Sequence, residues 1–420
     1  MTTGPISFEI QARSGNARTG TVRTPHGSFS TPAFMTVGTK GTVKGITPLH
    51  LTQCGAEVVL NNTYHLMLRP GEDLVRRMGG VHRFMNWGGP ILTDSGGYQA
   101  YSMADINAVD EDGVTFKSIV TGSPVRLTPE RSMEIQNALG PDIIMAFDDC
   151  PPSVDPTAGP VNQTRIRLAA ERDRSGVGYD HELRLDLANE RTVRWLERCK
   201  RAHARPEEQG LFGIVQGGTD LDRRAWSAER VCNIELPGYA IGGVAVGEMH
   251  EDIVRVVEHT APMLPDDKPR YLMGVGYERD LVAAVRAGVD MFDCVLPTRN
   301  GRNANAFTRH GQIRLKNSKY SEDPNPIEPG CDCPACNPAQ HGFPTLDGAP
   351  FSRSYLRHLF ISKEMLGPIL VSLHNLRHFQ RLMVDIRTAV QKDDWSGLVR
   401  DWPVAFDTES LRHPDDRSNA

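Results

Sequence analysis

The amino-acid sequence predicts an α/β fold, a (β/α)8 barrel, from three observations. Short apolar runs recur along the chain, each with a polar or glycine-rich end and a following segment of helical length. Fully apolar strands that alternate with helices are typical of a parallel sheet covered on both faces. The polar residues lie at the C-terminal ends of the runs, where barrel enzymes carry their active sites. An open doubly wound sheet is the alternative, but no GxGxxG motif follows the first strand.

Seven runs have this pattern, and an eighth strand is expected at residues 41–46 or 306–313. Residues 5–37 alternate β-forming residues with Gly, Asn and Pro, which predicts short antiparallel strands before the barrel. The seven runs span residues 57–66, 90–99, 142–150, 211–218, 239–248, 270–276 and 289–299.

Composition shifts divide the chain into predicted parts. A charge-dense stretch at about 159–190 predicts a surface insertion with some helix. The Pro- and Gly-rich residues 337–351 predict an irregular loop. Apolar residues at helical spacing over 354–391 predict two helices broken at Gly367–Pro368. The predicted parts are an antiparallel cap (1–40), the barrel (41–315), a zinc-binding helical subdomain that completes the barrel (316–392) and a polar tail (393–420).

Composition and charge exclude several classes of protein. Of the 420 residues, 39% are hydrophobic and 24% are charged, as in an ordinary globular protein. The net charge of −5 argues against a globally basic nucleic-acid binder but allows a local basic patch. Neither a signal-peptide pattern at the N-terminus nor an apolar run of membrane-spanning length is present, so we expect a cytoplasmic protein with no membrane partner.

Three of the eight cysteines cluster in the sequence CDCPAC, namely Cys331, Cys333 and Cys336. Close cysteine spacing in a cytoplasmic chain is typical of zinc binding, and zinc requires a fourth ligand. With four protein ligands such a site is structural, because no position stays open for water or substrate. The candidate fourth ligands are the nearby histidines His341, His358, His374 and His378.

Polar side chains end several of the predicted strands. If the barrel closes, they face one pocket, where acceptor oxygens, an amide and a backbone N–H suit a purine edge such as that of guanine. Each of them is also compatible with a purely structural role, such as a hydrogen bond to loop backbone or an ion pair with a following arginine. The residues concerned are Asp94, Asp148, Gln216, Gly242, Gly243 and Asp293.

The pair Asp94 and Asp293 suggests chemistry at a glycosidic bond. An aspartate with an unperturbed pKa of ~3.9 is ionised at neutral pH and can attack an anomeric carbon, while a second carboxyl group moves a proton. Basic residues after Asp293 could bind RNA phosphates beside the pocket, although charged helix residues usually form a solvated face. These basic residues are Arg299, Arg302, Arg314, Lys316, Lys319, Arg377, Arg381 and Arg387.

Together these motifs resemble the bacterial tRNA-guanine transglycosylase (queuine tRNA-ribosyltransferase) family, over about residues 6 to 392. The strings that carry the resemblance are LTDSGGYQ, MAFDDC, GIVQGG, GGVAVGE, YLMGVG, FDCVLPTRNGRNANAFT and CDCPAC. The resemblance implies a TIM barrel with one structural zinc ion. It also implies exchange of guanine at the wobble position of GUN anticodons for a 7-deazaguanine base, through a covalent RNA intermediate and without an organic cofactor.

The resemblance assigns roles to individual residues. Asp293 would be the nucleophile, Asp94 the general acid and base, and Tyr98 would stack on the base. His374, from the sequence LHN, would complete the zinc site. The remaining base-binding residues would be Ser95, Gly96, Gly97, Asp148, Cys150, Gln216, Gly242, Gly243, Val246 and Met273, and the tRNA contacts Arg299, Arg302 and Lys316.

The resemblance also bears on the entering base and the assembly. Val246 and Cys150 match the bacterial type, which favours 7-aminomethyl-7-deazaguanine (preQ1) over the bulkier queuine. Departures at Ala304 and Asn305 put the local loop shape in question. A homodimer is expected. The alternatives are queuine as entering base, a non-catalytic tRNA-binding partner subunit, and a metal-dependent barrel hydrolase, for which the clustered histidines are missing.

Overall fold

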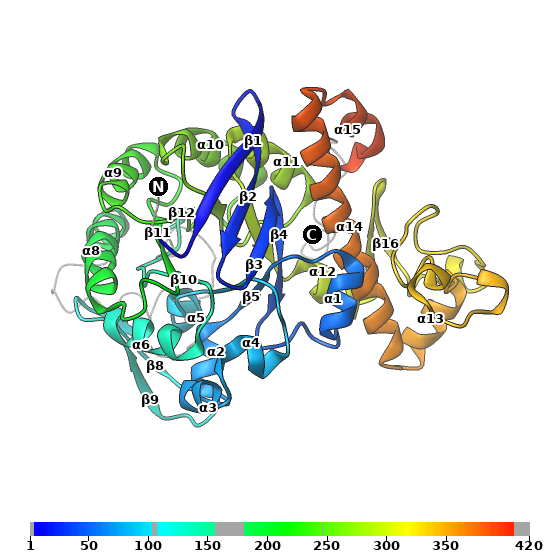
Figure 1. Cartoon of the computed structure of the whole chain (residues 1–420), viewed down its shortest axis with the longest axis horizontal. Coiled ribbons are helices and arrows are strands. Elements are labelled where there is room, and N and C mark those ends of the chain that lie inside the picture. The colour runs from blue at the N-terminus through cyan, green and yellow to red at the C-terminus, as the bar shows by residue number, and fades with distance from the viewer. Residues whose placement is uncertain (1–3, 103–106, 156–179, 246, 407–420) are drawn as a thin grey trace.

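A closed barrel of eight parallel strands forms the centre of the protein (Figure 1). The computed structural model describes residues 4–102, 107–155, 180–245 and 247–406. The strands are β4 (Ala33–Gly38), β5 (Val59–Asn61), β6 (Ile91–Thr93), β10 (Ile143–Met145), β11 (Gly210–Val215), β12 (Gly238–Ile241), β13 (Arg270–Leu272) and β14 (Met291–Cys294). The predicted fold is confirmed, and each of the seven apolar runs overlaps a barrel strand.

The predicted position of the eighth strand was wrong. It is β4, which pairs with β14 from Ala33 opposite Met291 and closes the ring against β5. Residues 41–46 contain no strand, and β15 (Asn305–Thr308) pairs with β16 (Gly311–Arg314) as a hairpin outside the barrel. The strands before β4 are antiparallel and similar to it in composition. The sequence therefore does not show that the chain leaves the N-terminal sheet after Pro32 and enters the barrel.

The predicted N-terminal antiparallel strands are present as β1 (Ser7–Ser14), β2 (Ala17–Thr24) and β3 (Gly27–Thr31). They close the end of the barrel opposite to the strand C-termini. Val22 and Phe29 are buried in the same apolar cluster as residues of the barrel strands. Because β1–β3 cover this end of the barrel, only the end at the strand C-termini is left for ligands.

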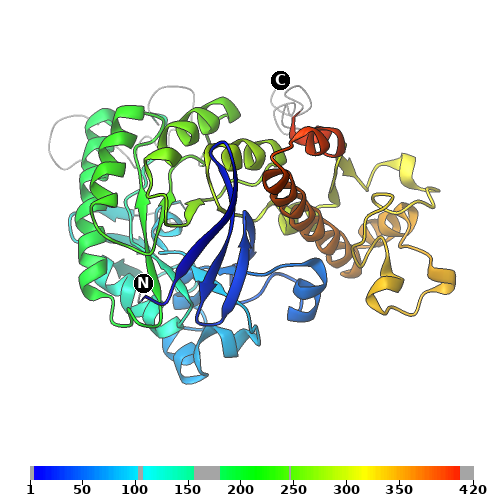
Figure 2. The same cartoon turned by 45° about the horizontal axis from the view of Figure 1, so that its top comes forward.

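Helices surround the barrel, as a parallel sheet covered outside requires (Figure 2). The short helices that follow β4 and β5 are α1 (Pro48–Cys54), α2 (Thr63–Leu68), α3 (Glu72–Arg77) and α4 (Gly80–Met85). The later ones are α5 (Gly97–Ser102), α6 (Pro129–Leu139), α8 (His181–Ala202), α9 (Leu221–Cys232), α10 (His250–Thr260), α11 (Glu278–Ala287) and α12 (Leu296–Arg302).

Two excursions interrupt the barrel between β6 and α8. The first is a three-stranded antiparallel sheet, β7 (Asn107–Val109), β8 (Val114–Lys117) and β9 (Pro124–Leu127), which the sequence analysis did not predict. The second is the predicted insertion. Its residues 159–179 lie outside the described part, and its end, 181–190, begins α8.

The C-terminal region consists of α13 (Arg353–Ile361) and the long α14 (Leu366–Lys392), which lies along the barrel next to α12 (Figures 1 and 2). The predicted break at Gly367–Pro368 is slightly too late. The chain turns at Ser362–Met365, with Lys363 at φ 60°, and Pro368 belongs to the first turn of α14, where its missing N–H costs nothing. Residues 337–351 carry only two short 3-10 turns, as an irregular loop should, Pro338–His341 and Leu346–Gly348.

The predicted polar tail is wrong for residues 393–406. Helix α15 (Ser396–Asp401) and a 3-10 turn (Pro403–Ala405) return to the protein, and Trp402 is fully buried. Its indole N–H donates a hydrogen bond of 2.8 Å to Asp385 on α14. Within the described residues, no helix is both long and apolar enough to span a membrane.

Candidate active site

A cavity of about 1000 Å³ opens at the C-terminal ends of the barrel strands. Residues that follow different strands converge on it because parallel strands end at the same edge. Asp94 follows β6, Asp148 follows β10 and Gln216 follows β11. Gly243 follows β12, and Asp293 belongs to β14. The sequence prediction that these residues face one pocket is confirmed.

Asp94 is a buried carboxylate held by neighbours at the end of β5. The Thr63 backbone N–H donates to its Oδ1 at 2.8 Å, and the Asn62 amide donates to its Oδ2. Burial is the main cause that raises the pKa of Asp94 to about 7, with a further contribution from the charge of Asp293. A carboxyl group with this pKa can both give and take a proton at neutral pH.

Asp293 is held by two donors on its Oδ1 atom. The Tyr271 hydroxyl lies 2.6 Å away and the Gly274 backbone N–H 2.8 Å away. Burial raises the pKa of Asp293, while these two hydrogen bonds stabilise the carboxylate and oppose that shift. Its partners are therefore a phenol and a backbone N–H; the ion pair with an arginine that the structural alternative required is not among the described contacts of Asp293.

Asp148 and Gln216 form a coupled pair at the base of the cavity. The Gln216 amide donates to Asp148 Oδ2 at 2.7 Å, and the Ser95 hydroxyl donates to Oδ1 at 3.3 Å. Burial raises the pKa of Asp148 to about 6. The pair presents carboxylate and amide oxygens to a ligand, as reading the donor edge of a purine requires.

Two glycine turns bring backbone close to this pair. Gly243 has φ +64°, and a Cβ there would lie 2.4 Å from Gln216 Oε1, so only glycine fits. Gly96 has φ +78°, and a Cβ on Gly97 would come within 3.1 Å of the Asp148 carbonyl. Neither turn adds a side chain of its own beside Asp148 and Gln216.

The other predicted base-binding residues have mixed outcomes. Tyr98, Cys150, Gly242 and Met273 line the cavity, and Tyr98 keeps 40% of its surface exposed. Val246 lies outside the described residues.

The predicted RNA contacts differ in position. Arg299 lines the cavity, Arg302 follows one turn later on α12, and Lys316 is exposed beyond β16. The arginines of α14 are bound within the protein instead: Arg377 pairs with Asp332 at 2.6 Å, Arg381 with Glu328 at 3.1 Å, and Arg387 donates to the Pro32 carbonyl at 2.8 Å. These three are poor candidates for an RNA track.

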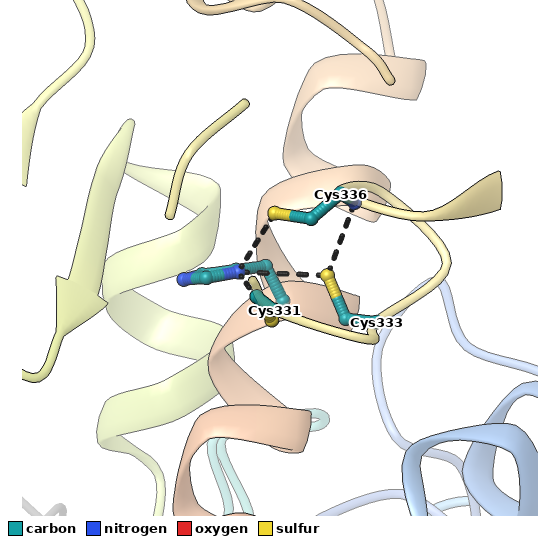
Figure 3. Close-up of side chains that lie close together, drawn as sticks. Cys331, Cys333 and Cys336 are labelled. Carbon is teal, nitrogen blue, oxygen red and sulfur yellow. Dashed lines mark hydrogen bonds between the residues drawn. The ribbon is translucent and has the colours of Figure 1, made fainter. Parts of the chain in front are cut away.

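Cys331, Cys333 and Cys336, which Figure 3 labels, form with His374 a buried cluster that could hold a metal ion. The three sulfurs lie 3.5–3.6 Å from His374 Nδ1. Tetrahedral ligands with Zn–S ~2.3 Å and Zn–N ~2.05 Å lie about 3.6 Å apart, so the spacing fits zinc. The Phe307 carbonyl lies 2.7 Å from His374 Nε2 and fixes the ring orientation.

Of the four histidines considered as fourth ligand, His374 is therefore the one in the cluster. His378 lies one turn further along α14 and pairs with the buried Glu278 at 2.8 Å. His341 contacts the Asp332 carbonyl at 2.7 Å. Since His378 and His341 have other partners, the cluster joins the 330s loop to α14 through His374 alone.

Sequence comparisons identify the family of the chain. The profile of the family described as queuine tRNA-ribosyltransferase matches residues 13–172 and 177–407. The chain belongs to this family. A queuine tRNA-ribosyltransferase from Thermus thermophilus is 47% identical over 398 residues, covering 95% of this chain and 94% of the relative. Relatives with the same name from Lysinibacillus sphaericus (47% over 395 residues, 94% of each chain) and Staphylococcus aureus (46% over 381 residues, 91% of each chain) are similar.

For a chain of the queuine tRNA-ribosyltransferase family, the residues that sequence reasoning missed are the supports of the two acids. Asn62 and Thr63 hold Asp94, and Tyr271 and Gly274 hold Asp293. The signal was present but weak. Each pair belongs to an apolar run that predicts a strand, LNNTYHL or RYLMGVG. Tyr271 lies within β13, and Asn62, Thr63 and Gly274 follow the ends of their strands.

Proposed function

We propose that this protein exchanges guanine at the wobble position of tRNAs with GUN anticodons for preQ1, a step of queuosine biosynthesis, by double displacement. The observation that carries the proposal is that Asp94 and Asp293 face one cavity beside a purine-reading set of groups. Their surroundings differ, so the two carboxyl groups suit different roles.

In the first half-reaction Asp293 is the nucleophile. Both of its described hydrogen bonds go to Oδ1, which leaves Oδ2 to attack C1′ of the ribose. The bond from C1′ to guanine N9 breaks as the bond to Asp293 forms, and Asp94 gives its proton to the departing guanine. The product is a covalent enzyme–RNA ester with an inverted anomeric carbon.

In the second half-reaction preQ1 takes the place of guanine. Its N9 attacks C1′ while Asp94 accepts the N9 proton, and the Asp293 carboxylate leaves. Two inversions give net retention. The pKa of about 7 lets Asp94 act as acid in one half and as base in the other.

Base recognition uses the floor of the cavity. Asp148 accepts from N1–H and the 2-amino group, and the Gly243 N–H donates to O6. Gln216 holds Asp148 in place, and Tyr98 stacks on the exposed face of the base. Residues Ser95, Cys150, Gly242 and Met273 complete the pocket, and the turn at Gly96 and Gly97 lies behind it, against Tyr64 and the Asp148 carbonyl.

The entering base is preQ1 in this proposal, on the basis of Val246 and Cys150. Queuine is the second candidate, because a cavity of about 1000 Å³ exceeds what a purine base fills. A non-catalytic partner subunit is disfavoured because both acids are present with their supports.

Further parts of the proposal concern partners and metal. Arg299, Arg302 and Lys316 bind tRNA phosphates; among the described residues none of the three forms an ion pair. A zinc ion on the Cys3His cluster fastens the 330s loop to α14 and takes no part in the chemistry. The protein acts as a homodimer in the cytoplasm.

The test is exchange of radiolabelled guanine out of a GUN tRNA, with preQ1 and queuine as competing entrants. The proposal requires loss of label with preQ1 at lower concentration than with queuine. Preferred use of queuine would overturn the choice of base, and retention of label with both bases would overturn the function. Size-exclusion chromatography with light scattering tests the dimer in the same preparation.

A further inference from the structure

Arg224, in the first turn of α9, is a fully buried arginine whose contacts are all with backbone carbonyls. Nε and Nη2 donate to the Gly218 carbonyl at 2.9 and 2.7 Å. Nη1 donates to the carbonyls of Val215 at 2.9 Å and Gly242 at 2.7 Å, and Nη2 also to that of Gly243 at 3.2 Å. The guanidinium thus uses its five N–H groups on the ends of β11 and β12.

A buried cation without an ion-pair partner needs an explanation. No carboxylate lies within ion-pair distance of Arg224 among the residues that the structure describes. Burial lowers its pKa to about 10, while the charge of Glu248, beyond ion-pair distance, opposes this shift, so the group still carries its charge at neutral pH. Its place near the N-terminus of α9 is also unfavourable, because the helix dipole is positive there.

The position of the contacts supplies the explanation. In a trans peptide the C=O and the following N–H point in opposite directions. Arg224 holds the Gly242 carbonyl from behind, so the N–H of Gly243 in the same peptide points the other way, on the side of Gln216 and the cavity. The left-handed φ of Gly243 makes this peptide able to rotate, which the hydrogen bond prevents.

The geometry points to Arg224 as the positioning residue that aims the Gly243 N–H at the O6 acceptor of the purine. This inference rests on the proposed function. Arg224 touches no substrate; it sets specificity by fixing the orientation of one peptide. Its loss should weaken recognition of O6 while leaving recognition of the 2-amino group by Asp148 intact.

The test compares three entering bases in the wild type and in Arg224→Lys, which keeps a cation but cannot serve four carbonyls. 6-Thioguanine replaces O6 by a poor acceptor and keeps the other groups, and hypoxanthine lacks only the 2-amino group. We expect the preference of kcat/KM for guanine over 6-thioguanine to fall by about three- to tenfold in the variant, the range of one neutral hydrogen bond. The preference for guanine over hypoxanthine should stay unchanged.

Arg18→Lys is the matched control. Arg18 is also fully buried and also donates to backbone carbonyls, those of Asp266 and Lys268 at 2.7 Å each. It differs in having a buried ion pair with Asp290 at 2.6 Å and in lying at the opposite end of the barrel. The Arg18→Lys variant should be less stable than the wild type, but its kcat/KM preferences for guanine over 6-thioguanine and over hypoxanthine should be those of the wild type.

Three results would overturn the assignment of Arg224. They are an unchanged 6-thioguanine preference in Arg224→Lys, an equal fall of both preferences, and the same fall in Arg18→Lys. If instead the wild type exchanges no guanine at all, the proposed function itself fails and the assignment falls with it, so the two failures are distinguishable.

Discussion

Replacing Asp94 by asparagine tests the raised pKa on which the acid and base roles depend. Burial raises this pKa from 3.8 to about 7, so the folded protein holds the Asp94 proton more tightly than the unfolded chain does. The stability of the wild type should therefore fall as the pH rises from about 4 to about 7, because ionisation is favourable in the unfolded chain and opposed in the folded one. Asparagine does not ionise, so the variant escapes this loss.

The magnitude follows from the two pKa values. Ionisation of Asp94 destabilises the folded wild type by roughly 2 kcal/mol at pH 5 and roughly 4 kcal/mol at pH 8. Between these pH values the unfolding free energy of Asp94→Asn should gain about 2–3 kcal/mol over that of the wild type. The weakened hydrogen bond from Asn62 lowers the stability of the variant by a similar amount at both pH values, so it cancels from the comparison.

Urea unfolding followed by tryptophan fluorescence at pH 5 and pH 8 measures this difference. Glu130→Gln is the control, because the hydrogen bond from Arg198 lowers the Glu130 pKa to about 2. That carboxyl group is ionised at both pH values in the folded state, and in the unfolded chain, where its pKa is 4.5, it is about three-quarters ionised at pH 5. The Glu130→Gln difference should therefore change by no more than about 0.2 kcal/mol. An equally flat difference for Asp94→Asn would refute the raised pKa and with it the reasoning for a proton carrier at this position.

Three further predictions concern the nucleophile, the metal and the C-terminal segment. Tyr271→Phe removes a hydrogen bond that stabilises the ionised Asp293 carboxylate, so single-turnover guanine release should be slower by roughly 10- to 100-fold. The pH profile of this rate should shift to higher pH, because the pKa of Asp293 rises further without that bond. An unchanged rate would contradict the role of Tyr271. Mass spectrometry of the metal content should find one zinc ion per chain that Cys333→Ser loses together with thermal stability, and zinc-free wild-type protein of full stability would disprove the structural metal. Trp402→Ala should lower the unfolding free energy by about 3–5 kcal/mol, whereas a loss below about 1 kcal/mol would mean that the segment after α14 does not pack as described.

The sequence was most informative where one physical signal acted alone. Buried parallel strands must be apolar along their whole length, and this located seven of the eight barrel strands. It could not locate β4, because Ala33–Gly38 continues a series of antiparallel strands and differs from them only in its partners. The cysteines of the metal-binding cluster were similarly direct, since three cysteines within six residues have few other uses. The choice of His374 over His378 depended on which face of α14 meets the 330s loop.

Three features of the protein depend on long-range contacts and could not be predicted from the sequence: the raised pKa values of the two acids, the burial of Trp402 and the contacts of Arg224. The ordinary pKa of an isolated aspartate was the starting assumption for Asp293, but burial raises the pKa of both acids, and only the fold reveals how deeply each is buried. The polar composition after Lys392 concealed Trp402, whose place in the core depends on Asp385 and His378 of the helix before it. The contacts of Arg224 involve carbonyls of two separate strands and leave no mark in the sequence pattern.

A denaturing gel of the protein incubated with a GUN tRNA tests the central claim most directly, because it detects the ester between Asp293 and the ribose. The wild type should give a band of protein bound to RNA that disappears when preQ1 is added, and Asp293→Asn should give none. A band of undiminished intensity in Asp293→Asn would contradict the assignment of the nucleophile.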